Sequence, residues 1–171
     1  MKKLLIVVDY QKDFVDGALG FPGAEKLAGP IQNKIEVYRA AGDEVVFTFD
    51  THGPDYLQTQ EGKNLPVSHC LEGSEGWGLY PPLAVTEGEK VFRKPTFGSA
   101  DLFDYLRNNA YESIELVGLV SSICVISNAV LAKAAQPETP IIVDSACTDG
   151  FDKELHAAAL KVMAGLQMKV I

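Results

Sequence analysis

Short apolar runs alternate with helical patterns along the whole chain. Residues 4–8 are apolar at every position, which is typical of a parallel strand covered on both faces. Similar runs predict further strands at residues 44–49, 90–93, 113–119, 139–143 and 167–171. Apolar positions at helical spacing predict helices at residues 24–41, 100–108, 123–135 and 152–164. The alternation predicts an α/β fold, a three-layer αβα sandwich around a mostly parallel, Rossmann-like sheet of five to six strands.

One segment breaks this alternation. Residues 51–89 are rich in Gly, Pro and Ser and show little periodicity. A loop of this length inside a compact domain usually has a function. Because it follows the second predicted strand, we expect it at the carboxyl edge of the sheet, where open α/β folds bind ligands. No linker or change of composition divides the chain, so residues 1–171 are predicted to form a single domain.

Charge argues against a nucleic-acid partner. Fifteen Lys and Arg face 23 Asp and Glu, giving a formal charge of −8. A surface that follows phosphates needs clustered basic residues. Among the three cysteines there is no CxxC pair, and an odd count is typical of reduced thiols.

Two apolar stretches could be mistaken for membrane or export signals. The first ends at Asp9 and is too short for the apolar region of a signal peptide. The second, residues 116–135, has the length of a membrane span but contains Ser, Asn and Lys. We interpret it as a buried strand leading into a helix, and expect a cytoplasmic protein with no membrane partner.

Residues with reactive side chains fall at the predicted carboxyl ends of four strands: Asp9, Asp50, Lys94 and Cys124. Such ends converge on one crevice in a parallel sheet. Asp9, Lys94 and Cys124 together supply the proton acceptor, cation and nucleophile of covalent acyl transfer. At a helix start, Cys124 is predicted to have a depressed pKa. Each residue alone has a plainer interpretation, such as a buried structural cysteine.

Histidines suggest a second site. Asp50, His52 and His69 could place two imidazoles and a carboxylate on one divalent ion, and Glu61 could add a fourth ligand. This spacing is looser than a tight metal motif, so a metal site and its absence both stay open at this point. The third histidine, His156, lies on the last predicted helix and is interpreted as a structural hydrogen-bonding residue.

Five motifs in order give the chain a specific resemblance. They are residues 7–14 (VVDYQKDF), 47–52 (FTFDTH), 69–73 (HCLEG), 94–99 (KPTFGS) and 118–125 (GLVSSICV). Together they resemble the cysteine hydrolases of the isochorismatase-like superfamily, in particular the nicotinamidase-like branch, nearly from end to end.

The resemblance implies roles for individual residues. It implies a catalytic triad of Asp9, Lys94 and Cys124, a cis peptide before Val120, and an oxyanion hole formed by the backbone amides of Val120 and Cys124. It implies one divalent metal ion (zinc, manganese or iron), a substrate ring packed by aromatic residues, and a homo-oligomeric assembly. The implied metal ligands are Asp50, His52, His69 and Glu61, and the implied ring contacts are Phe14 and Phe97.

Two departures bear on the substrate. Nicotinamidases usually carry an aromatic residue shortly before the second metal histidine, whereas residues 64–68 here read NLPVS. Trp77 is one candidate to replace that wall of the pocket. After the lysine, residues 97–101 (FGSAD) replace the more usual Tyr-Ser-Ala-Phe.

These observations predict a cysteine amidohydrolase that cleaves the C–N bond of a small carboxamide resembling nicotinamide, through a thioester, with release of ammonia. The alternatives are a cysteine hydrolase of another small carbamoyl or ureido substrate and a catalytically idle scaffold of the same fold. An isochorismatase proper fits less well, because vinyl-ether hydrolysis in that branch does not need a nucleophilic cysteine. The identity of the metal and of the substrate stay open here.

Overall fold

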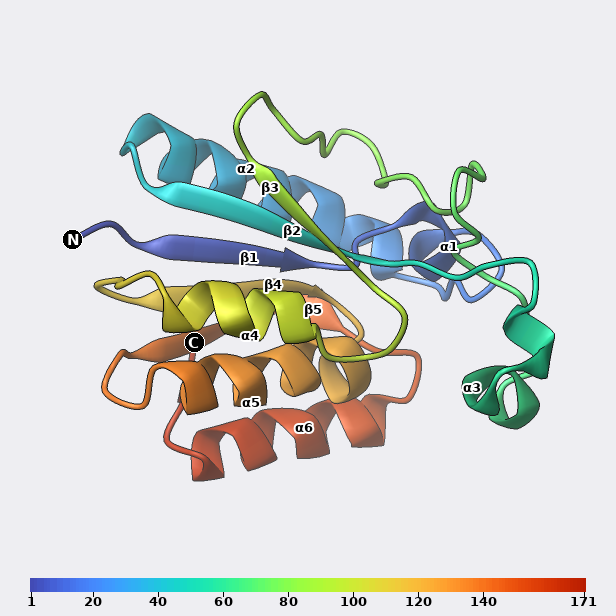
Figure 1. Ribbon diagram of the computed structural model, residues 1–171. Coiled ribbons are helices and arrows are strands. Elements are labelled where there is room, and N and C mark those ends of the chain that lie inside the picture. The colour runs from blue at the N-terminus through green and yellow to red at the C-terminus, as the bar shows by residue number, and fades with distance from the viewer.

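The computed structural model describes residues 1–171 and is built on a six-stranded sheet (Figure 1). All neighbouring strands are parallel, in the order β3-β2-β1-β4-β5-β6. The α/β prediction is confirmed, and the sheet is parallel throughout. The strands are β1 (Leu4–Val8), β2 (Glu44–Asp50), β3 (Lys90–Lys94), β4 (Ile114–Leu119), β5 (Ile141–Asp149) and β6 (Lys169–Val170).

Helices cover both faces of the sheet and produce three layers (Figure 1). The 3₁₀ turn η1 (Ala24–Leu27) and helix α2 (Ala28–Ala40) lie on one face. Helices α4 (Ala100–Arg107), α5 (Ile126–Ala135) and α6 (Lys153–Gly165) lie on the other. Residues of β1 alternate between the two cores, which explains why the whole strand is apolar.

Three short helices were not predicted from the sequence. Helix α1 (Lys12–Val15) follows β1, and the 3₁₀ turn η2 (Tyr56–Gln58) and helix α3 (Gln60–Asn64) lie within the long loop after β2. The helix predicted from residue 123 instead begins with a π-helical turn, η3 (Ser121–Val125), which continues into α5. None of the helices is both long and apolar enough to span a membrane.

The two central strands, β1 and β4, flank the point where the chain reverses its direction of travel across the sheet. From β1 the chain proceeds to β2 on one side, and the second half builds β4, β5 and β6 on the other. Gly118 in β4 has φ +112°, and a Cβ there would lie 2.0 Å from the carbonyl oxygen of Val8. Only glycine permits this close approach. Ligands of open α/β folds bind in the crevice outside such a point.

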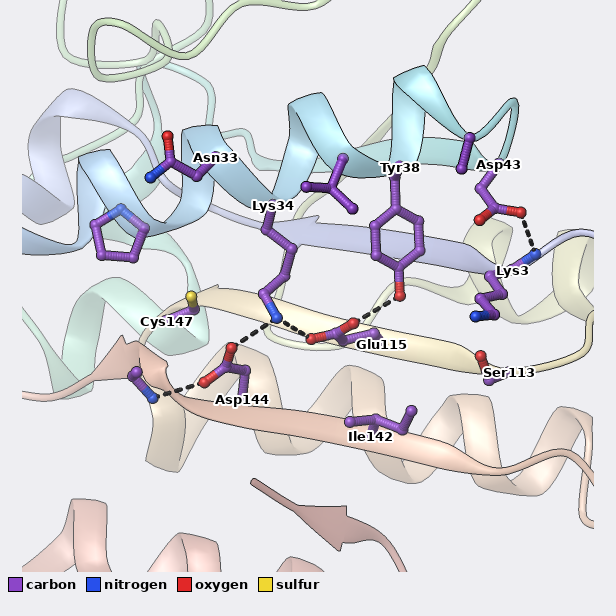
Figure 2. A pocket seen from close by; sticks show the side chains of 14 residues that line it. Lys3, Asn33, Lys34, Tyr38, Asp43, Ser113, Glu115, Ile142, Asp144 and Cys147 are labelled. Carbon is purple, nitrogen blue, oxygen red and sulfur yellow. Dashed lines mark hydrogen bonds and ion pairs between the residues drawn. The ribbon is translucent and has the colours of Figure 1, made fainter.

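A polar groove of about 580 Å³ lies between α2 and strands β4 and β5, toward the amino ends of the strands (Figure 2). Lys34 Nζ lies 2.5 Å from Glu115 Oε1 and 2.6 Å from Asp144 Oδ2, and the Tyr38 hydroxyl donates to Glu115 Oε2 at 2.6 Å. Burial alone would raise the pKa of Asp144, but hydrogen bonds from Lys34 and the Ala146 amide lower it. These contacts join α2 to the sheet, and the groove lies away from the carboxyl edge.

Candidate active site and metal cluster

Asp9 occupies the turn directly after β1. Its φ is +44°, a left-handed conformation that Asp tolerates better than most residues. The side chain is fully buried. The Thr48 hydroxyl donates a 2.6 Å hydrogen bond to Asp9 Oδ1, and Lys94 Nζ lies 2.6 Å from Oδ2. Both carboxylate oxygens are therefore held in place.

Lys94 reaches Asp9 from two strands away. It is the last residue of β3 and pairs with Asp50 at the end of β2. Its ammonium donates to the Thr96 carbonyl at 2.9 Å and lies 3.7 Å from Cys124 Sγ. Burial would lower the pKa of Lys94, but the negative charge of Asp9, with a smaller effect of Asp50, raises it. The lysine is therefore a permanent cation between the carboxylate and the sulfur.

Cys124 lies in the π-helical turn η3, after β4, and is 5% exposed. The peptide between Leu119 and Val120 is cis, as the sequence resemblance implied. The Val125 amide donates to the Val120 carbonyl at 3.1 Å, which closes the turn around the cysteine. The structure thus brings Asp9, Lys94 and Cys124 together from three separate strand ends.

The predicted low pKa of the thiol is wrong. Burial and the Asp9 carboxylate raise the pKa of Cys124 well above the ordinary thiol value, and Lys94 offsets only part of this. Burial also raises the pKa of Asp9, against the lowering effect of Lys94. The start of a helix stabilises a thiolate at Cys124 less than burial and the Asp9 carboxylate destabilise it. The surroundings of Cys124 therefore favour the thiol over the thiolate.

A second cluster lies beside this group. Asp50, His52, Glu61 and His69 each offer one ligand atom, and these atoms all lie within 4.8 Å of one another. Asp50 Oδ2 is 3.0 Å from His52 Nε2 and 3.2 Å from His69 Nε2. Glu61 Oε1 is 3.7 Å from both ring nitrogens. All four residues named from the sequence therefore meet, although Glu61 belongs to a helix that was not predicted.

The donor set suits a divalent metal ion. Asp50 Oδ1 is buried and has no hydrogen-bond partner. His69 Nδ1 lies 2.8 Å from the Val67 carbonyl, which holds that nitrogen protonated and leaves Nε2 free as a ligand. Two imidazole nitrogens and two carboxylates are typical ligands for such ions. Burial would raise the pKa of Asp50, but its contacts with the His52 and His69 rings and the charge of Lys94 lower it.

Two buried amides position the reactive groups and were missed from the sequence. Gln11 accepts from the Asp50 amide at 2.8 Å and donates to the Asp50 carbonyl at 2.9 Å. Asn128 accepts from the Ser99 amide at 3.0 Å and donates to the Cys124 carbonyl at 2.8 Å. The only available signal was the place of Gln11 within the first motif, because the partners of both amides are distant in sequence.

The two groups open on one cavity of about 490 Å³. Phe14 and Phe97 line it, and the Phe14 ring meets His69 edge-on at 5.5 Å. Trp77 does not line it and was wrongly suggested as a pocket wall, since its indole donates to Thr51 at 2.9 Å. The sequence did not identify the other apolar lining residues, which are Ala18, Leu19, Leu65, Ile123 and Phe151.

The interpretation of His156 is confirmed. His156 Nδ1 lies 2.8 Å from Ser121 Oγ, so this histidine makes a structural hydrogen bond. Cys70, next to His69, is completely buried in the apolar core and does not belong to the metal cluster.

Comparisons with known proteins find similar sequences over almost the whole chain. A family model for the isochorismatase domain matches residues 3–171. An uncharacterised isochorismatase family protein of Bacillus subtilis is 33% identical, over 96% of this chain and 95% of that protein. The nicotinamidase/pyrazinamidase of Mycobacterium tuberculosis is 27% identical, over 99% of this chain and 98% of that protein.

Solved structures show the same fold. The pyrazinamidase of Pyrococcus horikoshii in complex with zinc superposes with a TM-score of 0.88 at 23% identity, covering 100% of this chain and 99% of that one. The N-carbamoylsarcosine amidase of Thermoplasma acidophilum superposes with a TM-score of 0.83 at 28% identity, covering 99% and 95%.

Proposed function

The chain belongs to the isochorismatase family, in its nicotinamidase branch, and is an amidohydrolase acting on C–N bonds; we propose that it hydrolyses a small aryl carboxamide of the nicotinamide type through a thioester on Cys124. One observation carries the proposal. Lys94 Nζ lies 2.6 Å from Asp9 and 3.7 Å from Cys124. Cys124 lines a cavity that is also lined by three members of the metal cluster, Asp50, Glu61 and His69.

The first step joins proton transfer to nucleophilic attack. Because Cys124 rests as a thiol, Asp9 accepts its proton as the sulfur attacks the amide carbon. Lys94 stabilises the carboxylate before transfer and the developing charge on sulfur during it. The backbone N–H groups of Val120 and Cys124 donate to the tetrahedral oxyanion, a contribution of about 3 kcal/mol per donor.

The second step releases ammonia and regenerates the enzyme. Asp9 returns the proton to the amide nitrogen, the C–N bond breaks, and ammonia leaves a thioester on Cys124. Water then attacks the thioester carbon and gives a proton to Asp9. The C–S bond breaks, the acid product departs, and the sulfur regains its proton from Asp9.

The cavity walls would orient the aromatic ring of the substrate. Phe14 and Phe97 would pack against the substrate ring. Asp50, His52, His69 and Glu61 would hold a divalent cation, which would bind the ring nitrogen and fix the carboxamide near Cys124. Positioning of this kind is a large part of the rate gain when two groups must react.

A carbamoyl or ureido acid is the alternative substrate, supported by the likeness to the amidase from Thermoplasma acidophilum. Such substrates carry a carboxylate that needs a cationic partner. The cavity is lined by no Lys or Arg, and its charged or ionisable side chains are Asp50, Glu61, His69 and Cys124. With the divalent cation of the cluster occupied by the ring nitrogen, the lining offers no second cation for a carboxylate and therefore favours an uncharged aryl amide. The intact group of Asp9, Lys94 and Cys124 argues against an idle scaffold.

Ammonia release from nicotinamide tests the proposal. We expect turnover by the metal-loaded protein and a loss of at least about 10³-fold in Cys124→Ala, since removal of a nucleophile leaves only residual catalysis. Cys147→Ala is the matched control, because Cys147 is also buried but lies outside the cavity. Equal rates for the wild-type protein and Cys124→Ala would refute the role of Cys124 as the nucleophile. Mass spectrometry of the protein mixed with substrate should detect the acyl adduct only when Cys124 is present.

A further inference from the structure

The cavity is larger than a single-ring amide requires. Its volume is about 490 Å³, whereas a protein cavity of about 150 Å³ is sufficient to bind benzene. The catalytic and metal groups occupy one end, where Asp50, His69 and Cys124 are each less than 10% exposed. Space therefore remains beyond a ring that is held at this buried end.

The mouth of the cavity is apolar and open to solvent. Phe151 is 63% exposed, Phe97 44% and Leu65 38%. They come from three separate segments, before α6, after β3 and after α3, and all three line the cavity. Exposed large apolar side chains that converge on one opening are typical of ligand-binding surfaces. Phe151 is held there by an edge-on contact with Phe21 at 6.5 Å.

Charge is confined to the buried end. The acidic lining residues are Asp50 and Glu61, both members of the metal cluster. The remaining wall toward the mouth is formed by Ala18, Leu19, Gly20, Leu65, Phe97, Ile123 and Phe151, none of which carries a charge. A charged group packed against these side chains would lose part of its hydration without gaining a partner from the wall.

We propose that the preferred substrate is an aryl carboxamide with an uncharged, apolar substituent on the ring, and that Leu65 and Phe151, next to the ring-packing Phe97, bind this substituent. This inference rests on the proposed function, because it assumes that the carboxamide lies against Cys124 and the ring nitrogen faces the metal cluster. Carbon 5 of a nicotinamide ring lies on the edge away from both groups, so a substituent at this position extends toward the mouth.

A substrate series tests the proposal on the metal-loaded wild-type protein. The compounds are nicotinamide and its 5-methyl, 5-propyl and 5-carboxyethyl derivatives, with ammonia release as the assay. We expect kcat/KM to rise about fourfold for each buried methylene. The carboxyethyl compound, similar in length to the propyl compound, should be at least about tenfold worse because its charge is unpaired.

Variants localise the effect. Phe151→Ser and Leu65→Ser should each reduce the propyl-to-hydrogen ratio of kcat/KM toward one. Val162→Ser is the control, because Val162 is 52% exposed on α6 but does not line the cavity, and it should keep the wild-type ratio. Thermal melts check that each variant is folded.

The outcomes separate the two proposals. Hydrolysis of nicotinamide without any gain from the propyl group would overturn the apolar subsite and leave the proposed function intact. A gain that survives both Phe151→Ser and Leu65→Ser would overturn the assignment to these side chains. No ammonia from any compound would refute the proposed function itself.

Discussion

Thr48 offers a direct test of Asp9 as the proton acceptor. Its hydroxyl donates a 2.6 Å hydrogen bond to Asp9 Oδ1, and both residues are fully buried. Valine has nearly the shape of threonine, so Thr48→Val removes the donor with little change in packing. A hydrogen bond to a charged acceptor contributes about 1.5–3 kcal/mol, and about 1.4 kcal/mol corresponds to one pKa unit. We expect the pKa of Asp9 to rise by about 1–2 units.

The assay is the pH dependence of kcat/KM, measured on the metal-loaded protein. Its acid limb reports protonation of the essential base in the free enzyme. A protonated Asp9 cannot accept the proton of Cys124. Since Thr48→Val favours the protonated form, the acid limb should move upward by about 1–2 pH units. Activity should fall most at acidic pH and recover toward the wild-type value as the pH rises.

Thr48→Ser is the matched control, because serine keeps the hydroxyl. It should restore the acid limb to its wild-type position, even if the lost methyl group lowers stability. If Thr48→Val lowers kcat/KM by the same fraction at every pH and the acid limb does not move, the proposed effect on the pKa of Asp9 is refuted. It would mean that Thr48 supports only packing and that the limb belongs to another group.

Three further changes test other parts of the structure. Gly118→Ala places a Cβ 2.0 Å from a backbone oxygen of β1 at φ +112°, so calorimetry should show a Tm lower by about 10 °C. Gly165→Ala has open space around its Cβ and should cause no such loss. Gln11→Ala removes the amide that holds the backbone of Asp50, so equilibrium dialysis should show divalent-metal affinity reduced about 10–100-fold; unchanged affinity would contradict the positioning role. Asp144→Asn should cost about 1–2 kcal/mol at about pH 7 in urea unfolding. Ion pairing lowers the pKa of Asp144 in the folded state. The stability that the Asp144 carboxylate contributes is therefore complete above about pH 4 and is lost as the pH falls through the folded-state pKa. A destabilisation by Asp144→Asn that persists at about pH 2 would contradict this reasoning.

The strands could be predicted because burial on both faces leaves an unbroken apolar run. Beyond Val143 this signal fails, since β5 continues to Asp149 through polar and exposed residues. The register also shifts between Leu116 and Gly118 on the neighbouring strand. Helix α3 has only five residues, too few for a period to be recognised. It packs closely on the preceding 3₁₀ turn, where Gly62 lies against the backbone of Tyr56.

The candidate site could be located from the sequence because parallel strands end at one edge. That rule brings Asp9, Lys94 and Cys124 together without any knowledge of side-chain conformation. It gives no information on groups that act through the backbone of another segment, as Gln11 does 39 residues from Asp50. It also misjudged the thiol pKa, because the cost of burial depends on how completely the cavity excludes water.

Charge balance links the metal cluster to the catalytic group. Asp9, Asp50 and Glu61 bring three carboxylates into a largely buried region, where Lys94 is the single ammonium that lies against Asp9 and, at 3.7 Å, against Asp50. With all four ionised, two negative charges remain uncompensated. Burial first, and then the neighbouring charge of Asp50, raises the pKa of Glu61. A divalent cation held by the cluster would compensate both charges, whereas a monovalent cation would leave one. The same ion would leave Lys94 free to interact with Asp9 and Cys124, so the proposed metal ligands and the proposed catalytic residues would form one electrostatic unit.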